Sequence, residues 1–297
     1  MKEINFIRSA LFVPGDRPDR VDKAVKTAAD MVVIDLEDAV PLATKNETRP
    51  KVRDKILQYK NRNVIVRVNG LDSEFIYKDL TELAVEGLSC IMLPKVERAE
   101  HIREINRLLL TAEKENGIPE GGISVIALIE SAFGIEHAFQ IVSEKTEPQR
   151  LFAIAFGAAD FTLDMGMEIT KTGEELIYPR ARLAVACRAA GVAPPIDSPF
   201  MIDLKDMDAL EADTKRAKQF GYQGKLCIHP NQVEVCNRIF SPTKEEIEYA
   251  QKVVQAFNES EAGGTGVILV EGKFVDYPVV EQAKRILRMA ELISPSG

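Results

Sequence analysis

Two carboxylates stand where two successive apolar runs of this chain end. Glu130 follows the run 125–129, and Asp160 follows the run 151–156 after a short Gly-Ala-Ala step. Each run is typical of a buried strand, and carboxylates at the same end of neighbouring parallel strands can hold a hard divalent cation such as Mg²⁺. Such a site leaves positions open for a substrate, so the pair predicts a metal-assisted lyase or transferase chemistry on a small anionic molecule.

The other apolar runs also end in charged residues or residues of a catalytic type. One such ending has an ordinary explanation, a helix cap or a solvated loop acid, but endings of this kind after all eight runs are difficult to explain by solubility alone. His229, beside a proline, is expected to be structural. The endings of the remaining runs are Pro14-Gly15-Asp16-Arg17, Asp35-Leu36-Glu37-Asp38, Arg67, Lys95, Asp197 and His229.

Arg67 has two interpretations. It could neutralise Glu37 or Asp38, or its planar guanidinium could hold a substrate carboxylate or a thioester enolate oxygen. Five acids near one metal would carry too much charge, so at least one is expected to be paired away from the metal. Asp35 is the acid least expected to act, because side chains alternate along a strand and Glu37 competes for the same face.

A group of cations follows the first apolar run. Gly15 is followed by Arg17, Arg20 and Lys23. This is either an ordinary polar first turn of a helix or a grip for a phosphorylated handle, since a glycine turn, a helix N-terminus and cations favour phosphate. The sequence leaves both possibilities open.

The order of elements predicts an α/β fold, a (β/α)₈ TIM barrel. Amphipathic segments separate the apolar runs, among them 97–116 and 175–190, the latter with Leu176, Ala181, Val185 and Ala189 expected on its apolar face. A doubly wound open sheet is the competing fold. The eight runs expected as strands are 9–13, 31–36, 64–68, 90–93, 124–129, 151–156, 192–196 and 225–228.

The alternation stops near residue 240, which predicts a catalytic barrel domain over 1–240 and a C-terminal module over 241–297. Thr243 and Glu246 have capping-box spacing and should begin a helix. The glycine-rich segment 263–266 is expected to be a flexible hinge. A hairpin over 267–275 and a last helix from about Pro278 complete a module that we interpret as a lid.

Composition excludes several classes of partner. Of the 297 residues 45% are hydrophobic, and 38 Lys and Arg against 46 Asp and Glu give a formal charge of -8, so nucleic-acid binding is not expected. The four cysteines lack CxxC spacing and indicate buried thiols in a reducing compartment. The chain starts without a signal-peptide pattern and contains no apolar stretch of the ~20 residues that span a bilayer. A cytoplasmic protein with no membrane partner is expected.

Several motifs resemble the citrate lyase β-subunit-like group of the HpcH/HpaI aldolase superfamily, which includes malyl-CoA, citramalyl-CoA and citryl-CoA lyases. The matching stretches occur in one order over nearly the whole chain. They are RSALFVPG at 8–15, DLEDAV at 35–40, VRVNG at 66–70, LPKV at 93–96, IES at 129–131, GAADF at 157–161, GKLCIHP at 224–230 and GKFVD at 272–276.

The resemblance implies roles for individual residues. It implies a barrel whose Mg²⁺ is held by Glu130 and Asp160, with Arg67 in contact with the reacting acyl or keto-acid group. Glu37 and Asp38, beside this arginine in the expected site, are candidate catalytic residues. For the CoA moiety, the resemblance implies contacts near the turn of Pro14 and Gly15, with Arg17 and Lys23 near the phosphates.

The resemblance also implies a homotrimer in which the lid of one subunit covers its neighbour's site. Asp276 would then act in trans as the acid/base. By position alone, an aspartate at the end of a hairpin and just before a proline-containing helix start is more often a turn or helix-cap residue.

The predicted reaction is Mg²⁺-dependent retro-Claisen cleavage of a 3-hydroxyacyl-CoA thioester, of citramalyl, malyl or citryl type, to acetyl-CoA and a 2-keto acid. One alternative is a citrate lyase β subunit acting on citryl-acyl carrier protein in a complex; the stretch 228–232 slightly favours the stand-alone CoA lyases. Another is a Mg²⁺ aldolase of free keto acids, against which the C-terminal module argues. The non-enzyme alternative is an inactive acyl-thioester-binding scaffold.

Overall fold

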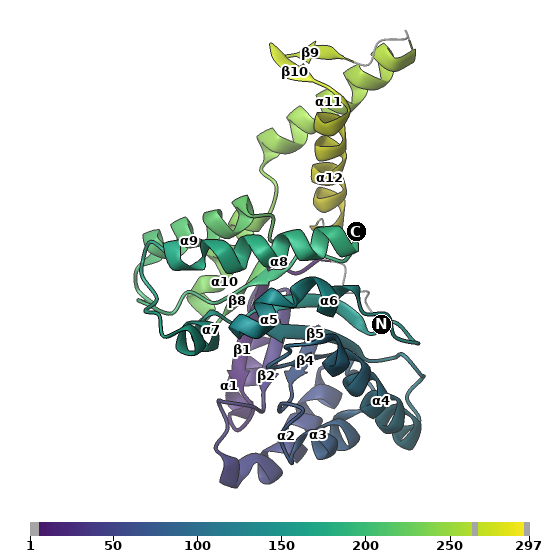
Figure 1. Ribbon diagram of the computed structural model, residues 1–297, viewed down its shortest axis with the longest axis vertical. Helices are drawn as coiled ribbons and strands as arrows, with labels where there is room; N and C mark the ends of the chain where they lie inside the picture. Colours follow the sequence, from purple (N-terminus) through teal and green to yellow (C-terminus); the bar gives the residue numbers. More distant parts are fainter. Residues whose placement is uncertain (1–5, 263–266, 294–297) are drawn as a thin grey trace. The chain divides into compact units, whose positions relative to one another are not determined.

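The computed structural model describes residues 6–262 and 267–293, and its central feature is a closed barrel of eight parallel strands (Figure 1). The strands pair in chain order, and β1 closes the barrel on β8 with Ser9 opposite Lys225. The predicted TIM barrel is therefore confirmed, and the open sheet is wrong. The strands are β1 (Ser9–Pro14), β2 (Met31–Asp35), β3 (Val64–Arg67), β4 (Cys90–Leu93), β5 (Ser124–Ile129), β6 (Leu151–Phe156), β7 (Ile196–Asp197) and β8 (Gly224–Cys227).

Helices follow the strands and cover the outside of the barrel (Figure 1). Both faces of the strands are thus buried, which explains why the strands are continuous apolar runs. The helices are α1 (Pro18–Ala24), α2 (Lys45–Gln58), α3 (Ile76–Leu83), α4 (Ala99–Asn116), α5 (Ala132–Glu136), α6 (Ala138–Ser143), α7 (Ala158–Met165), α8 (Ile177–Ala190), α9 (Met207–Gln219) and α10 (Pro230–Phe240), with short 3₁₀ turns η1 (Leu42–Thr44) and η2 (Glu174–Leu176).

The seventh strand differs from the prediction. The run 192–196 was expected to be a strand, but β7 consists only of Ile196 and Asp197. Val192 donates its N–H to Cys187 at the end of α8. The two prolines at 194–195 have no N–H to give to a ladder, so pairing begins only after them.

The buried face of α8 also differs from the prediction. Val185, expected on the apolar face, is 63% exposed, and Ala189 is exposed as well. Arg180 is 1% exposed instead, because two carboxylates neutralise it inside the protein. The periodicity of apolar residues therefore predicted the wrong buried face for α8, because the charged Arg180, paired with two acids, lies at the centre of the face that is buried.

The interior of the barrel is filled by every second residue of the strands. This layered set is apolar and fully or almost fully buried. It consists of Ile7, Ala10, Met31, Val33, Ile65, Cys90, Met92, Ile126, Leu128, Ala153, Ala155, Ile196 and Leu226, with Phe12, Phe152 and Ala193 packed against it.

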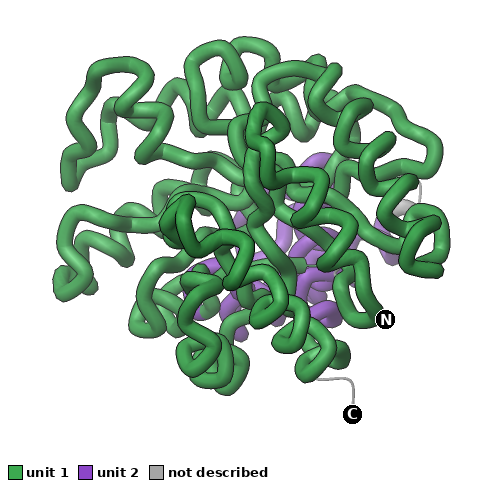
Figure 2. Tube along the Cα trace, turned by 90° about the horizontal axis from the view of Figure 1, so that it is seen from below, with its two compact units in different colours: residues 1–237 green, residues 238–297 purple. Residues whose placement is uncertain are grey.

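The chain forms two compact units, residues 1–237 and 238–297, coloured green and purple in Figure 2. The division falls within α10, three residues before the predicted boundary at 240/241. Within the described ranges, no helix combines the length and the apolar character needed to cross a membrane.

The second unit contains α11 (Lys244–Ala262), the antiparallel strands β9 (Ile268–Val270) and β10 (Lys273–Val275), and α12 (Tyr277–Ile293). The predicted capping box is present, since Thr243 N donates to Glu246 Oε2 at 2.8 Å and Glu246 N to Thr243 Oγ1 at 3.1 Å. The predicted hinge at 263–266 lies outside the described residues. A separate small core holds this unit together: Ala250, Val253, Phe257, Val270, Val275, Val280 and Ala283.

Candidate active site

The inward positions of the barrel change from apolar to polar where the strands end. On β3, Ile65 belongs to the core and Arg67 is the next inward position, and on β5 the same step leads from Leu128 to Glu130. Asp35 ends β2 on the same face. Because all strands are parallel, these side chains meet at one end of the barrel, where the βα loops also converge.

A pocket of about 360 Å³ opens at this end of the barrel. Five of the residues predicted for the site line it together, although they come from five different βα segments. They are Pro14, Asp38, Arg67, Glu130 and Asp160. Asp35, Gly157 and Ser198, which were not predicted site residues, line it as well.

Three carboxylates hold Arg67 in place. Its Nε and Nη2 donate to the two oxygens of Asp35 at 2.7 and 2.6 Å, and its Nη1 lies 3.0 Å from Glu37 and 3.7 Å from Asp38. Burial opposes the charged form, but the bonds to Asp35 and the three negative charges raise the pKa of Arg67 above its ordinary value. Arg67 is therefore a fixed, permanent cation on the wall of the pocket.

Asp35 has a larger part in the site than the sequence indicated. The expectation that Arg67 would neutralise Glu37 or Asp38 is correct for both acids, but the two-bond partner is Asp35. Asp35 Oδ1 and Oδ2 also accept the backbone N–H groups of Glu37 and Ala39 at 2.9 and 3.1 Å. Asp35 thus joins Arg67 to the loop after β2. The alternation of side chains along β2 was the reason to expect no role for Asp35, but this alternation places Asp35 on the inner face of the barrel.

Glu130 is a buried carboxylate on the pocket wall. It is 5% exposed, and its Oε1 accepts the backbone N–H of Lys95 at 2.7 Å. Burial raises the pKa of Glu130 to about 8 against the effect of this bond, and the charges of Asp160 and Glu37 add to the rise. A nearby cation would restore the ionised form of this carboxyl.

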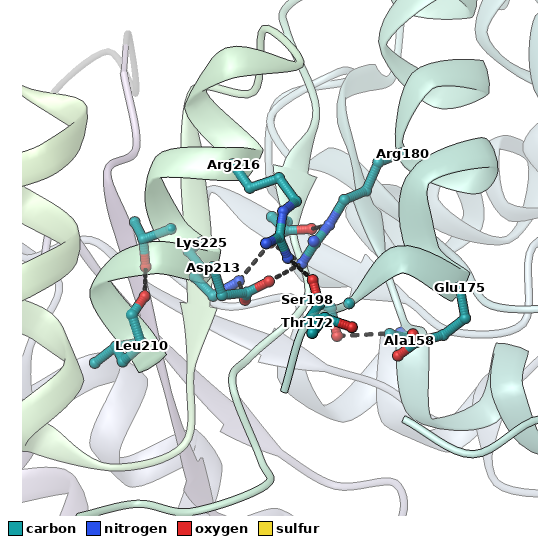
Figure 3. Close-up of polar contacts among 12 residues, drawn as sticks. Ala158, Thr172, Glu175, Arg180, Ser198, Leu210, Asp213, Arg216 and Lys225 are labelled. Carbon is teal, nitrogen blue, oxygen red and sulfur yellow. Dashed lines mark hydrogen bonds and ion pairs between the residues drawn. The ribbon is translucent and has the colours of Figure 1, made fainter. Parts of the chain in front are cut away.

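The segment after β6 leaves space for Glu130 and carries the second acid. A Cβ atom on Gly157 would lie 2.5 Å from Glu130 Oε2, so only glycine fits there. Helix α7 begins directly after Gly157, with Asp160 in its first turn. Its start is tied to the neighbouring strand by Ser198, whose Oγ accepts the N–H of Ala158 at 3.1 Å (Figure 3).

The donor set fits a Mg²⁺ ion. Glu130 and Asp160 offer hard oxygen ligands on one pocket, and burial raises the pKa of Glu130 even though the positive charge of Arg67 opposes the rise. Over the residues that the structure describes, no group of three or more His, Cys, Asp or Glu side chains is placed to hold a metal. Two carboxylates with the other positions left to water and substrate oxygens are typical of Mg²⁺ and not of a closed structural metal site.

A second pocket of about 480 Å³ lies on the other side of this carboxylate cluster. Glu37 and Asp38 line it, together with Lys45 and Lys95. Lys95 Nζ lies 2.8 Å from Glu37 Oε1, an ion pair without the alignment of a hydrogen bond. Burial raises the pKa of Glu37, while the charges of Arg67 and Lys95 oppose the rise.

The residues predicted to contact CoA are only partly gathered at the pocket. Pro14 lines it, and so does Arg20, but Gly15, Arg17 and Lys23 do not. Gly15 packs against β2, where a Cβ would lie 2.9 Å from a carbonyl oxygen. Arg17 forms an exposed ion pair with Asp19 at 3.2 Å, and Lys23 is exposed on α1. Their contact with CoA stays a prediction.

Asp276 lies in the second unit, where it caps α12. Its Oδ1 accepts the N–H of Val279 at 3.3 Å, and its carbonyl accepts the N–H of Val280. The helix-cap interpretation that the sequence left open is therefore present in the structure. A capping carboxylate can also take part in chemistry, and the role in trans stays a prediction.

The acid that ends the seventh strand does not belong to the pocket. Asp197 is fully buried and pairs with Arg180 at 2.9 Å and with Lys225. Asp213 completes the cluster, 2.8 Å from Arg180 and 2.7 Å from Lys225 (Figure 3). The next residue, Ser198, is the one that lines the pocket.

Comparison with known proteins agrees with this geometry. Residues 8–230 match the family HpcH/HpaI aldolase/citrate lyase. The chain belongs to this family. Within the HpcH/HpaI family, it is 39% identical over 285 residues to citrate lyase subunit beta of Leuconostoc mesenteroides subsp. cremoris, covering 95% of this chain and 93% of that protein. It is 34% identical over 309 residues to L-malyl-CoA/beta-methylmalyl-CoA lyase of Cereibacter sphaeroides, covering 97% and 95%.

Solved structures of similar proteins show the same fold. CitE from Mycobacterium tuberculosis, in complex with magnesium, acetoacetate and coenzyme A, has a TM-score of 0.77 at 29% identity over 97% of this chain and 99% of that one. A citrate lyase beta subunit from the same organism, complexed with oxaloacetate and magnesium, has a TM-score of 0.66 at 30% identity over 82% and 100%. The predicted family and the predicted class of enzyme, a carbon–carbon lyase, are confirmed.

Proposed function

We propose that this protein is a Mg²⁺-dependent lyase that cleaves a 3-hydroxyacyl-CoA thioester into acetyl-CoA and a 2-keto acid. The observation that supports this most strongly is the meeting of Glu130, Asp160 and Arg67 on one pocket at the C-terminal end of the barrel. The relatives support the same chemistry, since one is a malyl-CoA lyase and another was solved with magnesium, acetoacetate and coenzyme A.

In this proposal Glu130 and Asp160 hold the metal, which when bound polarises the hydroxyl and the adjacent carboxylate of the substrate. The carboxylate of Asp276, the proposed acid/base, takes the hydroxyl proton. The C–C bond then breaks and its electron pair passes to the thioester half, giving an enolate and a keto acid. Arg67 stabilises the developing negative charge. Because Asp35, Glu37 and Asp38 already hold the guanidinium, it does not have to be oriented when the substrate arrives.

The enolate carbon then needs a proton. Asp276, now protonated, is the proposed donor and returns that proton to the carbon, acting from a neighbouring subunit of a homotrimer. A lid that closes over the pocket would exclude water and prevent hydrolysis of the thioester. The CoA phosphates are proposed to contact three cations on or next to α1: Arg17, Arg20 and Lys23. The turn of Pro14 and Gly15, just before α1, is the proposed contact of the rest of the CoA moiety.

A second candidate function is cleavage of a citryl thioester carried by an acyl carrier protein. The identity of 39% to a citrate lyase subunit beta favours it. The two candidates share the metal site and the arginine and differ only in what carries the thioester.

A cleavage assay on a panel of thioesters separates these candidates. Citryl-, citramalyl-, malyl- and methylmalyl-CoA, and citryl-acyl carrier protein, are incubated with the protein with and without Mg²⁺, and products are measured by mass spectrometry. Mg²⁺-dependent release of acetyl-CoA from one CoA thioester, or of propionyl-CoA from methylmalyl-CoA, supports the proposal, and turnover of the carrier-protein thioester alone supports the second candidate. A free hydroxy keto acid is assayed alongside the panel: its turnover alone indicates an aldolase, and thioester binding without turnover indicates a scaffold.

Loss of a metal ligand tests the site itself. Glu130→Ala should lower kcat/KM by about 1000-fold or more, because the charge that holds the metal is lost. The exposed Glu120, in the loop before β5 at the opposite end of the barrel, is the matched control, and Glu120→Ala should leave the rate unchanged. Near-wild-type turnover by Glu130→Ala would show that the metal is held elsewhere.

A further inference from the structure

Lys95 has an unusual backbone for a residue with a side chain. It follows β4 by two positions and has a φ of +55°, in the left-handed region. Among the residues that the structure describes, Glu271 is the other non-glycine residue with a positive φ. For a residue with a Cβ this conformation costs roughly tenfold in population, so contacts elsewhere must hold it.

Lys95 contacts two carboxylates of the site, Glu130 and Glu37. Its backbone N–H donates to Glu130 Oε1 at 2.7 Å, and its Nζ lies 2.8 Å from Glu37 Oε1. Glu37 Oε2 in turn lies 3.0 Å from Arg67. One residue therefore links the buried carboxylate of β5 to the acid that holds the arginine of β3.

We propose that Lys95 is a positioning residue for Glu130: its left-handed backbone directs the amide onto Glu130 Oε1, and its ion pair with Glu37 keeps the backbone in that conformation. This inference rests on the proposed function in that it takes Glu130 as a metal ligand. With Oε1 accepting the amide, Oε2 keeps both lone pairs for a cation. Gly157 leaves the space that Oε2 occupies.

The burial of Glu130 makes this amide important. Glu130 is 5% exposed, and the Lys95 amide gives its Oε1 a hydrogen bond at 2.7 Å; a buried carboxylate oxygen left without such a partner is costly. Strain at a functional site of this kind persists only where the surroundings impose it. For Lys95, these surroundings are the ion pair with Glu37 and the hydrogen bond to the buried carboxylate of Glu130.

Substitutions at Lys95 can separate the backbone from the ammonium group. Lys95→Ala removes the ion pair and keeps the conformational penalty, so the loop should leave the left-handed conformation and release Glu130. Lys95→Gly also removes the ion pair but has no such penalty, since glycine adopts positive φ freely. Any difference between these two variants therefore reports the backbone, because neither has an ammonium group.

Binding of Mn²⁺, a spectroscopic substitute for Mg²⁺, is the first measurement. With the free Mn²⁺ signal followed by electron paramagnetic resonance, Lys95→Ala should bind about tenfold more weakly than wild type, and Lys95→Gly within about twofold of it. Equal affinity of wild type and Lys95→Ala would overturn the proposal. So would Lys95→Gly binding as weakly as Lys95→Ala, since the ammonium and not the amide would then matter.

Hydrogen exchange of the segment 93–97 in the metal-free protein is the second measurement, and it does not depend on a metal. The amide of residue 95 should exchange about tenfold faster in Lys95→Ala than in wild type and be protected again in Lys95→Gly. Unchanged exchange in Lys95→Ala would overturn the positioning role even if Mn²⁺ binds. If wild type shows the protection but binds no Mn²⁺, the positioning role stands and the proposed metal function fails.

Glu271 provides the matched control for backbone strain. It has a φ of +51° in the turn between β9 and β10 of the second unit. Glu271→Ala keeps the same conformational penalty and removes the ion pair with Lys252. It should leave both the affinity for Mn²⁺ and the exchange of segment 93–97 as in wild type.

Discussion

The ionisation of Glu130 gives a prediction at the scale of single residues. The pKa of this buried carboxyl, about 8, lies above its ordinary value of 4.5, so the folded state prefers the protonated form. The stability that this proton contributes is fully present below pH 4.5 and is lost as the pH rises through 8. We expect the free energy of unfolding of the metal-free protein, kept so by EDTA, to fall between pH 4.5 and pH 8. The fall in wild type should exceed the fall in Glu130→Gln by up to about 5 kcal/mol.

Urea unfolding at pH 5 and pH 9 measures this difference. In wild type, added Mg²⁺ should remove most of the loss of stability between pH 5 and pH 9, because a cation at the carboxylate stabilises the charged form. An identical pH dependence in wild type and Glu130→Gln would mean that Glu130 is ionised in the metal-free protein at neutral pH.

Gly157 gives a second prediction at this scale. A Cβ there would lie 2.5 Å from Glu130 Oε2 and 2.6 Å from Glu130 Cβ, so Gly157→Ala must displace the carboxylate. We expect affinity for Mn²⁺ to fall at least about tenfold, measured by calorimetry, with the melting temperature lowered by only a few degrees. Gly70→Ala is the control, because a Cβ at Gly70 meets nothing within 4 Å. Tight Mn²⁺ binding by Gly157→Ala would show that the Glu130 side chain can move without loss of affinity for the metal.

At the scale of elements, the buried cluster of Arg180, Asp197, Asp213 and Lys225 joins α8, β7, α9 and β8. Asp213 is buried, which disfavours its charge, but Lys225 and Arg180 outweigh this and lower its pKa to about 2. Its contribution to stability is therefore present above its ordinary pKa of 3.8 and is lost as the pH falls toward 2.

Removing one carboxylate from this cluster leaves two buried cations sharing one acid. Asp213→Asn should lower the free energy of unfolding by about 3–5 kcal/mol at pH 7, measured by urea denaturation. Lys215→Ala, which breaks an exposed pair with Glu211 on the same helix, should cost about 0.5 kcal/mol or less. A small effect of Asp213→Asn would mean that water reaches the cluster.

At the scale of the whole molecule, the prediction concerns how two subunits share one site. Asp276→Asn and Glu130→Gln should each be nearly inactive. If Asp276 acts in trans within a trimer, mixing the two variants at equal amounts and allowing subunit exchange should restore about a quarter of wild-type activity. In such hybrids some pockets keep Glu130 and face an intact Asp276 of the neighbouring subunit.

Mixed activity is measured by the thioester cleavage assay after incubation. Glu130→Gln mixed with Asp160→Asn is the control, because each pocket then lacks one metal ligand and no recovery is expected. Absence of recovery in the first mixture, with subunit exchange shown by native mass spectrometry, would place Asp276 in the same subunit's site or outside the chemistry.

The sequence by itself determined the barrel and the family, and it placed Glu130 and Asp160 at the same end of the barrel, because each of these depends on local patterns. Continuous apolar runs broken by amphipathic segments are the signature of strands buried on both faces. Glu130 directly follows one of these runs, and Asp160 follows the next after three residues. Matching motifs such as the GAADF stretch occur along the chain in one order. Even the capping box of Thr243 could be read from the spacing of two residues.

Only the tertiary structure decided the partners. Arg67 could have paired with several acids, and the register of β2 against β3 places Asp35 opposite it. The buried face of α8 depends on Arg180 meeting acids 17 and 33 residues away, which no helical period reveals. The left-handed Lys95 is held by Glu130 and Glu37, distant in sequence. Charge pairing and backbone strain depend on contacts between distant segments, and these form only when the barrel closes.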